Sequence, residues 1–328
     1  MYKFEPIYKT TLWGGNRILP FKGIEADTQA IGESWELSGV AGNESRVATG
    51  ADSGMTLTEL LARDGAALLG KDNYSRFGNE FPLLVKFIDA QQDLSIQVHP
   101  DDALAWERHQ SKGKTEMWYV VAADEGAHLR SGFAQSVTPD EYAASVGNHT
   151  ITDLLADYSV HAGDCFFLPA GRVHSIGAGS FIAEIQQTSD ITYRIYDFDR
   201  RDADGNPREL HTELAKKAID YTVQSDYRTH YDKQPDQPAK LVDCPYFTTK
   251  LYELTQPFSL PLSKLDSFVI LVCVEGGGMV TDNNGSSMPL TCGETLLVPA
   301  SVSQLQIVPK NGSTIKLLTS WINSPDGQ

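Results

Sequence analysis

The chain has 328 residues, of which 41% are hydrophobic and 21% charged, a composition typical of a folded protein with a sizeable core. Its 27 basic and 43 acidic residues give a formal charge of −16, which argues against nucleic acid or an anionic membrane surface as a partner. The longest apolar run, 268–274, is far shorter than the roughly 20 residues that span a bilayer, and the N-terminal sequence MYKFEPIYKTTLWGG has no signal-peptide apolar region. We therefore expect a cytoplasmic protein.

Strand signals dominate the chain. Short runs rich in β-branched and aromatic residues, punctuated by Gly, Pro and Asp, occur at 83–90, 94–100, 116–123, 164–170, 180–188, 191–198, 268–276 and 294–300. Helices are few: Thr56 and Thr138 each open a capping box, and two more helices are expected at 101–110 and 209–223. This pattern predicts a mainly β protein, either a sandwich or a barrel.

The segment 225–240 is polar, contains two prolines and lacks apolar periodicity, so we interpret it as a linker between a large N-terminal part and a smaller C-terminal part. A weak internal repeat crosses this division. GDCFFLPAGRVH, beginning at Gly163, aligns with GETLLVPASVSQ, beginning at Gly293, so that His174 corresponds to Gln304. The repeat indicates two related barrels, of which only the first keeps a histidine at this position; a chance match of two short apolar strands is the alternative.

Four polar residues in strand contexts form a candidate metal site. Gln97 and His99 are two residues apart in SIQVHP and therefore share one face of a strand. Glu116 opens the apolar strand EMWYVV, where a buried carboxylate needs a partner such as a cation. His174 follows a strand that ends at Pro169. Five residues separate Gly163 from Pro169 and four separate Pro169 from His174, a spacing that is the second signature motif of the cupin superfamily. Imidazole and carboxylate ligands suit Zn²⁺, Mn²⁺, Fe²⁺ or Ni²⁺.

Four longer segments carry a family resemblance. LSIQVHPDD, GKTEMWYV, LPAGRVHSIGAG and QQTSDITYRIYDFDR, in this order and spacing, resemble the short bacterial form of type I mannose-6-phosphate isomerase, or phosphomannose isomerase. The similarity extends from LWGGNRI near residue 12 through GESWELSG at 32–39 to about residue 223. The resemblance implies a cupin-like jelly-roll β-barrel catalytic domain with a few helices at 1–230. A smaller cupin-like β domain without a metal site would follow at 240–328.

The resemblance also implies an activity and a set of site residues. The activity is the interconversion of mannose 6-phosphate and fructose 6-phosphate with one Zn²⁺ per chain, so the partner would be a small-molecule sugar phosphate. The implied zinc ligands are Gln97, His99, Glu116 and His174. Arg194 falls on the family's catalytic arginine, Lys114 on a lysine two residues before the glutamate ligand, and Ser95, Glu184 and Asp190 on positions that line the active site. Longer family members carry an additional helical domain that this chain is too short to hold, so the residues that bind the phosphate stay open.

An aldose–ketose isomerisation needs a base near C1 and C2 and stabilisation of the enediolate oxygen. Arg194 suits the stabilising role, with a structural ion pair to Asp190 as the alternative. Lys114 suits phosphate binding or proton shuttling, with a solvated loop lysine as the alternative. Glu184 is the candidate base, because a carboxylate on the apolar strand SFIAEIQQ is costly without a role.

Two other functions compete with this interpretation. Another cupin metalloenzyme, such as an iron-dependent dioxygenase, is disfavoured by Gln97 in place of a ligand histidine and by the nearby cations. A non-catalytic sugar-phosphate sensor is disfavoured because every ligand and Arg194 are present. The oligomeric state stays open.

Overall fold

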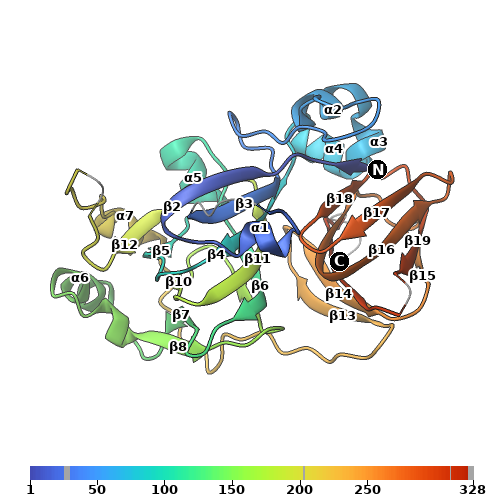
Figure 1. The fold of residues 1–328 in the computed structure, drawn as a ribbon. Helices are drawn as coiled ribbons and strands as arrows, with labels where there is room; N and C mark the ends of the chain where they lie inside the picture. Colours follow the sequence, from blue (N-terminus) through green and yellow to red (C-terminus); the bar gives the residue numbers. More distant parts are fainter. Residues whose placement is uncertain (26–29, 202–203, 311, 324–328) are drawn as a thin grey trace.

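The structure, a computed structural model, describes residues 1–25, 30–201, 204–310 and 312–323. The chain folds mainly into antiparallel β-sheets, and the orange and red C-terminal strands lie beside the blue, green and yellow N-terminal part (Figure 1). No helix in the described part of the chain is long and apolar enough to cross a membrane. The prediction of a mainly β, cupin-like protein is confirmed.

The N-terminal part contains two sheets. The strands of the six-stranded sheet are, in spatial order, β2 (Ile7–Gly15), β3 (Ile31–Leu37), β4 (Leu83–Asp89), β11 (Ser180–Gln187), β6 (Glu116–Ala123) and β9 (Cys165–Leu168). Those of the five-stranded sheet are β12 (Tyr193–Tyr196), β5 (Ile96–Val98), β10 (His174–Ile176), β7 (His128–Phe133) and β8 (Leu155–Ser159). One apolar cluster contains side chains from both sheets, such as Trp118 and Ile182 from the first and Leu129 and Ile176 from the second. The two sheets therefore pack face to face.

The third sheet has nine strands. Its main path runs through β1 (Tyr2–Lys3), β18 (Thr295–Val298), β16 (Val269–Asp282), β20 (Ile315–Trp321), β14 (Thr248–Leu254) and β13 (Pro238–Asp243). The long strand β16 also pairs with β17 (Ser287–Thr291) and β19 (Gln304–Pro309), and β19 pairs with β15 (Phe258–Pro261). These strands surround an apolar core of their own.

The described residues form seven short α-helices. The helices are α1 (Ile18–Phe21), α2 (Leu57–Asp64), α3 (Ala66–Leu69), α4 (Lys71–Phe77), α5 (Asp102–His109), α6 (Pro139–Gly147) and α7 (Thr212–Ala218), with a 3₁₀ turn at Ile151–Leu154. Both predicted capping boxes are present: the Thr56 and Thr138 hydroxyls accept from the backbone of Glu59 and Glu141, whose carboxylates accept in return. Each such cap stabilises its helix by about 1 kcal/mol.

The segment predicted as a linker is docked rather than free. Thr229 N–H donates to the Cys165 carbonyl at 2.8 Å, Tyr231 Oη donates to the Gly163 carbonyl at 2.5 Å, and Tyr227 is buried. Strand β13 already begins at Pro238, where an edge strand tolerates a proline. One core cluster also crosses the proposed division, since it contains Phe87 as well as residues such as Phe247. The domain boundary between 230 and 240 stays a prediction.

Candidate metal centre

Gln97, His99 and His174 come together in the five-stranded sheet. Gln97 on β5 lies opposite His174 on β10 in the antiparallel register, and the Nε2 atoms of the two side chains are 3.3 Å apart. His99 follows β5 two residues after Gln97, and its ring centroid lies 4.8 Å from that of His174. The neighbouring Ile96 and Val98 pack on the opposite face, against helices α6 and α7. Strand alternation therefore places Gln97 and His99 on the face that His174 shares, as predicted.

The two histidine rings are held in one orientation by backbone carbonyls. Nδ1 of His99 lies 2.8 Å from the Ile191 carbonyl, and Nδ1 of His174 lies 2.8 Å from the Arg172 carbonyl. Each Nδ1 therefore carries the proton and donates it, which directs the Nε2 lone pairs towards the site. Burial and the Lys114 ammonium lower the pKa of His174 to about 3 and that of His99 well below its ordinary value, so both rings are neutral.

Glu116 reaches the histidines from the opposite sheet. Its Oε1 lies 3.2 Å from His174 Nε2, and its Oε2 lies 3.5 Å from His99 Nε2. Apart from an ion pair with Lys114, neither oxygen accepts a hydrogen bond from the described part of the chain. Burial and the charge of Glu184 raise the pKa of Glu116 to about 7. A fully buried carboxylate with so few partners is costly unless a cation compensates it.

These atoms fit a divalent cation. One donor atom from each of His99, Glu116 and His174 lies within 4.8 Å of the others. Ligands about 2.1 Å from a tetrahedral zinc ion lie about 3.4 Å from one another, close to the 3.2 and 3.5 Å that separate the carboxylate from the two imidazoles. Gln97 would contribute its amide oxygen after a half-turn of the amide, whose two ends are assigned from hydrogen bonding. Neutral imidazole with carboxylate oxygen is a typical zinc donor set.

Lys114 lies within this group, as predicted. Its Nζ is 3.0 Å from His99 Nε2 and 2.8 Å from Glu116 Oε2, and its side chain is buried. The alternative of a solvated loop lysine is therefore wrong.

A second buried polar row crosses the six-stranded sheet next to Glu116. Glu184 on β11 lies opposite Lys86 on β4 and Trp118 on β6. Its carboxylate is 3.0 Å from Lys86 Nζ and accepts from Trp118 Nε1 at 2.7 Å. Burial alone would raise the pKa of Glu184, but Lys86, Lys114 and the Trp118 hydrogen bond lower it below its ordinary value. Glu184 is therefore ionised and held in one orientation inside the inter-sheet space.

Arg194 lies in the same row as two of the candidate ligands. It is opposite Gln97 in the pairing of β12 with β5, and Gln97 is in turn opposite His174. Adjacent strands are about 4.8 Å apart. Arg194 is therefore one strand away from Gln97 and two strands away from His174, both candidate metal ligands. Nη1 of Arg194 donates to the Glu209 carbonyl at 3.0 Å.

Ser95 and Asp190, also predicted from the resemblance, lie in different surroundings. Ser95 is buried immediately before β5, two residues from Gln97 and thus on its face. Asp190 is exposed and lines a depression of about 540 Å³ together with Ser189 and Trp106. The structure does not join Asp190 to the His99–Glu116–His174 group, and its role stays a prediction.

Trp118 is a site residue that the sequence analysis missed. Besides its hydrogen bond to Glu184, its indole packs against the His174 ring, with centroids 5.2 Å apart and planes at 85°. The signal was available: Trp118 is two residues after Glu116 on one strand and so shares its face.

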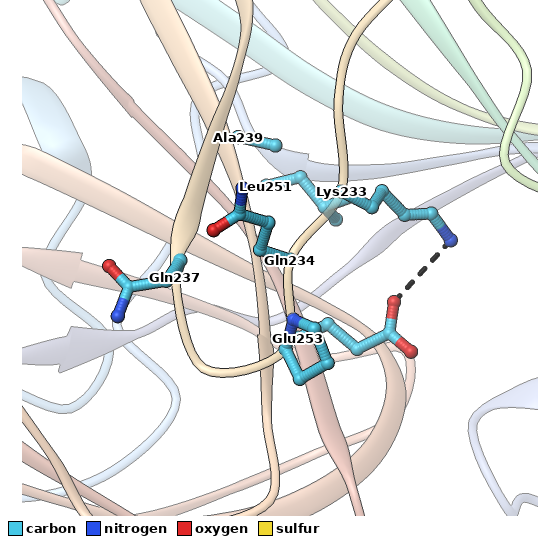
Figure 2. Close-up of a pocket in the computed structure, with 7 residues that line it drawn as sticks. Lys233, Gln234, Gln237, Ala239, Leu251 and Glu253 are labelled. Carbon is cyan, nitrogen blue, oxygen red and sulfur yellow. Dashed lines mark hydrogen bonds and ion pairs between the residues drawn. The ribbon is translucent and has the colours of Figure 1, made fainter.

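A pocket of about 200 Å³ lies elsewhere, between residues 233–237 and strands β13 and β14. Figure 2 shows its side chains, including the ion pair of Lys233 with Glu253 at 3.4 Å. None of the candidate site residues lines it.

Comparison with known proteins assigns the family. Residues 1–128 match the catalytic-domain model of type I phosphomannose isomerase, and residues 238–317 match the cupin-domain model of mannose-6-phosphate isomerase. The chain is 33% identical to the mannose-6-phosphate isomerase ManA of Bacillus subtilis, over 93% of this chain and 94% of that protein. It is also 33% identical to the mannose-6-phosphate isomerase of Streptococcus mutans, over 90% and 91% of the respective chains.

A solved structure agrees with this assignment. The crystal structure of the mannose 6-phosphate isomerase from Bacillus subtilis superposes with a TM-score of 0.86 at 29% identity, covering 97% of this chain and 98% of that one. The chain therefore belongs to the type I mannose-6-phosphate isomerase family.

Proposed function

We propose that this protein is a mannose-6-phosphate isomerase that uses one zinc ion per chain. The observation that carries the proposal is the buried His99–Glu116–His174 group, whose donor atoms converge as a cation requires, in a chain that is similar over most of its length to proteins of this name. When bound, the zinc ion would supply a positive charge for the sugar's carbonyl and hydroxyl oxygens. Gln97, His99, Glu116 and His174 would hold it.

The remaining residues would move the proton. The aldose loses the hydrogen on C2 as a proton, the electron pair forms the C1–C2 double bond of the enediol, and the proton returns to C1 of the ketose. Glu184 is the proposed base, because its carboxylate is ionised and fixed by Lys86 and Trp118. Arg194 would stabilise the developing negative charge on oxygen, and Lys114 would carry protons between the sugar oxygens. Ser95 and Asp190 are proposed as substrate-binding residues on the resemblance alone.

A coupled assay tests the activity. Purified, zinc-loaded protein is given mannose 6-phosphate, and fructose 6-phosphate formation is followed through auxiliary enzymes. We expect turnover, together with about one zinc ion per chain by elemental analysis. Absence of product together with bound iron would overturn the proposal in favour of another cupin metalloenzyme. Absence of product with sugar phosphate still bound would favour a sensor.

A histidine pair tests the metal. His174→Ala is expected to lose both the bound metal and turnover, because an imidazole donor is removed from a buried site. His161→Ala is the matched control, because His161 is exposed in the turn before Gly163. A His174→Ala protein that retained stoichiometric zinc would contradict the ligand assignment.

A further inference from the structure

Two guanidinium groups pair with one buried carboxylate just after strand β12, and a third lies within electrostatic range of it. Asp197 Oδ1 accepts from Arg200 Nη2 at 2.6 Å, and its Oδ2 accepts from Arg208 Nε at 2.6 Å. A second contact, from Arg208 Nη2 to Oδ1, makes the Arg208 pairing bidentate. The third guanidinium is that of Arg194, which lies on β12 three residues before Asp197. We call Arg194, Arg200 and Arg208 the arginine cluster.

The backbone after β12 is folded so that the cluster forms. Phe198 and Asp199 both have φ of 55°, a left-handed conformation that is unfavourable for residues other than glycine. This turn brings Arg200 back to Asp197. Further along, His211 N–H donates to the Arg194 carbonyl at 2.7 Å, and Arg194 N–H donates to His211 Nδ1 at 3.0 Å. These two hydrogen bonds hold the backbone near Arg208 beside Arg194.

The cluster lies at one end of the candidate active site. Arg194, Gln97 and His174 occupy one row across three adjacent strands. With strands about 4.8 Å apart, Arg194 lies about 10 Å from His174 along this row. In an open-chain hexose 6-phosphate, four bonds separate C2 from C6. A sugar whose C1 and C2 lie at the metal ligands would therefore extend its C6 end towards the arginines.

The charges of the cluster do not cancel. Three guanidinium groups face a single carboxylate, Asp197, which leaves an excess of two positive charges in a chain of net charge −16. The neighbouring acids Asp199 and Glu209 have side chains that are 70% and 83% exposed, and Asp199 lies 3.3 Å from His149. Burial and the charges of Arg208 and Arg200 lower the pKa of Arg194. Its Nε is buried and has no hydrogen-bond partner among the residues that the structure describes.

We propose that Arg200 and Arg208 bind the phosphate group of the substrate, with Asp197 as the positioning residue that holds both in place, while Arg194 keeps the role at the sugar oxygens proposed above. A phosphate monoester carries close to two negative charges at neutral pH, which matches the excess of the cluster. Planar guanidinium forks bind phosphate oxygens in a bidentate manner. The assignment to a sugar phosphate rests on the proposed isomerase function, whereas the affinity for phosphate itself does not.

Single substitutions test the cluster. Arg200→Gln and Arg208→Gln each remove one guanidinium. Arg201→Gln is the matched control, because Arg201 is exposed in the same segment and donates instead to the Gly205 carbonyl at 2.7 Å. Each cluster variant is expected to raise KM for mannose 6-phosphate about 10- to 100-fold with a smaller change in kcat. The Arg201→Gln protein is expected to keep the wild-type KM.

Inorganic phosphate separates this proposal from the isomerase function. Its binding to the zinc-loaded wild type and the variants is measured by calorimetry, without turnover. We expect the cluster variants to bind phosphate about 10-fold or more weakly, even if the protein proves not to be an isomerase. Unchanged phosphate affinity in well-folded Arg200→Gln and Arg208→Gln proteins would overturn the proposal. The two arginines would then only stabilise the conformation of the segment after β12. If the Arg208→Gln protein does not fold, the phosphate affinity of the Arg200→Gln protein alone tests the proposal.

Discussion

Substitutions at the buried ion pair of Lys86 and Glu184 can distinguish an effect on the stability of this protein from an effect on its catalysis. The two side chains are 9% and 3% exposed, and Nζ lies 3.0 Å from the carboxylate. Replacing Lys86 by Met leaves the Glu184 carboxylate between two sheets with the Trp118 N–H as its hydrogen-bond donor and only the more distant charge of Lys114 to stabilise it. Methionine is unbranched and only one atom shorter than lysine, so the perturbation is mainly the loss of one charge.

The expected magnitude follows from the geometry. At 3.0 Å, two unit charges attract by about 5 to 6 kcal/mol if the effective dielectric constant is about 20. Protonation of Glu184 in the variant relieves part of this loss, because the uncompensated carboxylate then has a raised pKa. We therefore expect Lys86→Met to lower the free energy of unfolding by about 3 kcal/mol at pH 7. The loss should shrink towards pH 5, since a raised folded-state pKa favours the folded protein as pH falls.

A double variant provides the diagnostic step. In Lys86→Met with Glu184→Gln both charges are removed, and the amide oxygen introduced at position 184 keeps the acceptor for Trp118. The free energy of unfolding of this variant in urea should return to within about 1 kcal/mol of wild type. Its turnover of mannose 6-phosphate should stay at least about 100-fold below wild type, because the proposed base is absent. Lys216→Met, which breaks an exposed ion pair with Asp140, is the control and should leave stability unchanged.

Two outcomes would refute this reasoning. A Lys86→Met protein as stable as wild type at pH 7 would mean that Glu184 is not held as a buried charge. A stable double variant with full turnover would mean that Glu184 is not the base, whatever its electrostatic surroundings.

Two further predictions concern Arg194 and Asp93. Arg194→Ala should keep its bound metal, because the arginine is not a ligand, but should lose turnover by about 100-fold or more; full turnover with intact metal content would exclude the proposed role. Burial alone would raise the pKa of Asp93, but hydrogen bonds from His128 and the Ala178 N–H and the charge of Arg130 lower it to about 2. The ionised Asp93 therefore stabilises the fold above about pH 4, and this contribution is lost as pH falls towards 2. Asp93→Asn should cost about 1 kcal/mol at pH 7 after allowance for solvent screening, and a urea titration in which the cost did not disappear near pH 2 would contradict the assignment.

Local patterns predicted the fold where the strands are buried on both faces. The predicted run 116–123 coincides with β6, and 83–90 differs from β4 by one residue. The bounds of strands and helices were predicted less well where the chain leaves a sheet. The run 94–100 contains only three strand residues, and the helix expected at 209–223 spans Thr212–Ala218. In that region the backbone of His211 bonds to Arg194 instead, a tertiary contact that sequence periodicity cannot show.

The same distinction applies to the site. Gln97 with His99, and Glu116 with the missed Trp118, follow from strand alternation, which is a property of neighbouring residues. The contacts between Glu116 and His174, or between Asp197 and Arg208, depend on which strands pack together and how a segment turns back. The adjacent residues Arg200 and Arg201 are equivalent in the sequence, and the structure distinguishes them through the contact of Arg200 with Asp197.

The internal repeat shows which residues stand at the candidate ligand positions in the C-terminal part. Gly163 and Gly293 have φ of 95° and 81°, and Arg172 N–H and Val302 N–H donate back to the carbonyls of Pro169 and Pro299, so the two segments share these features. They differ at Gly171, which has φ of 89°, whereas the equivalent Ser301 has no positive φ. Strand pairing then identifies the equivalent positions. Leu168 pairs with Glu116 while its counterpart Val298 pairs with Val269, and His174 pairs with Gln97 while Gln304 pairs with Pro261.

In the C-terminal sheet the ligand positions therefore hold residues of a different kind. Val269 packs in an apolar core where Glu116 would need a cation, and Gln304 is exposed and donates to Ser259 Oγ at 2.6 Å. Pro261 offers no side-chain donor in place of Gln97. At the described equivalent positions, the C-terminal part has neither the histidine nor the buried carboxylate of the candidate metal site. Both the histidine of the Gly-Pro-His spacing and the carboxylate that faces it thus distinguish the two parts.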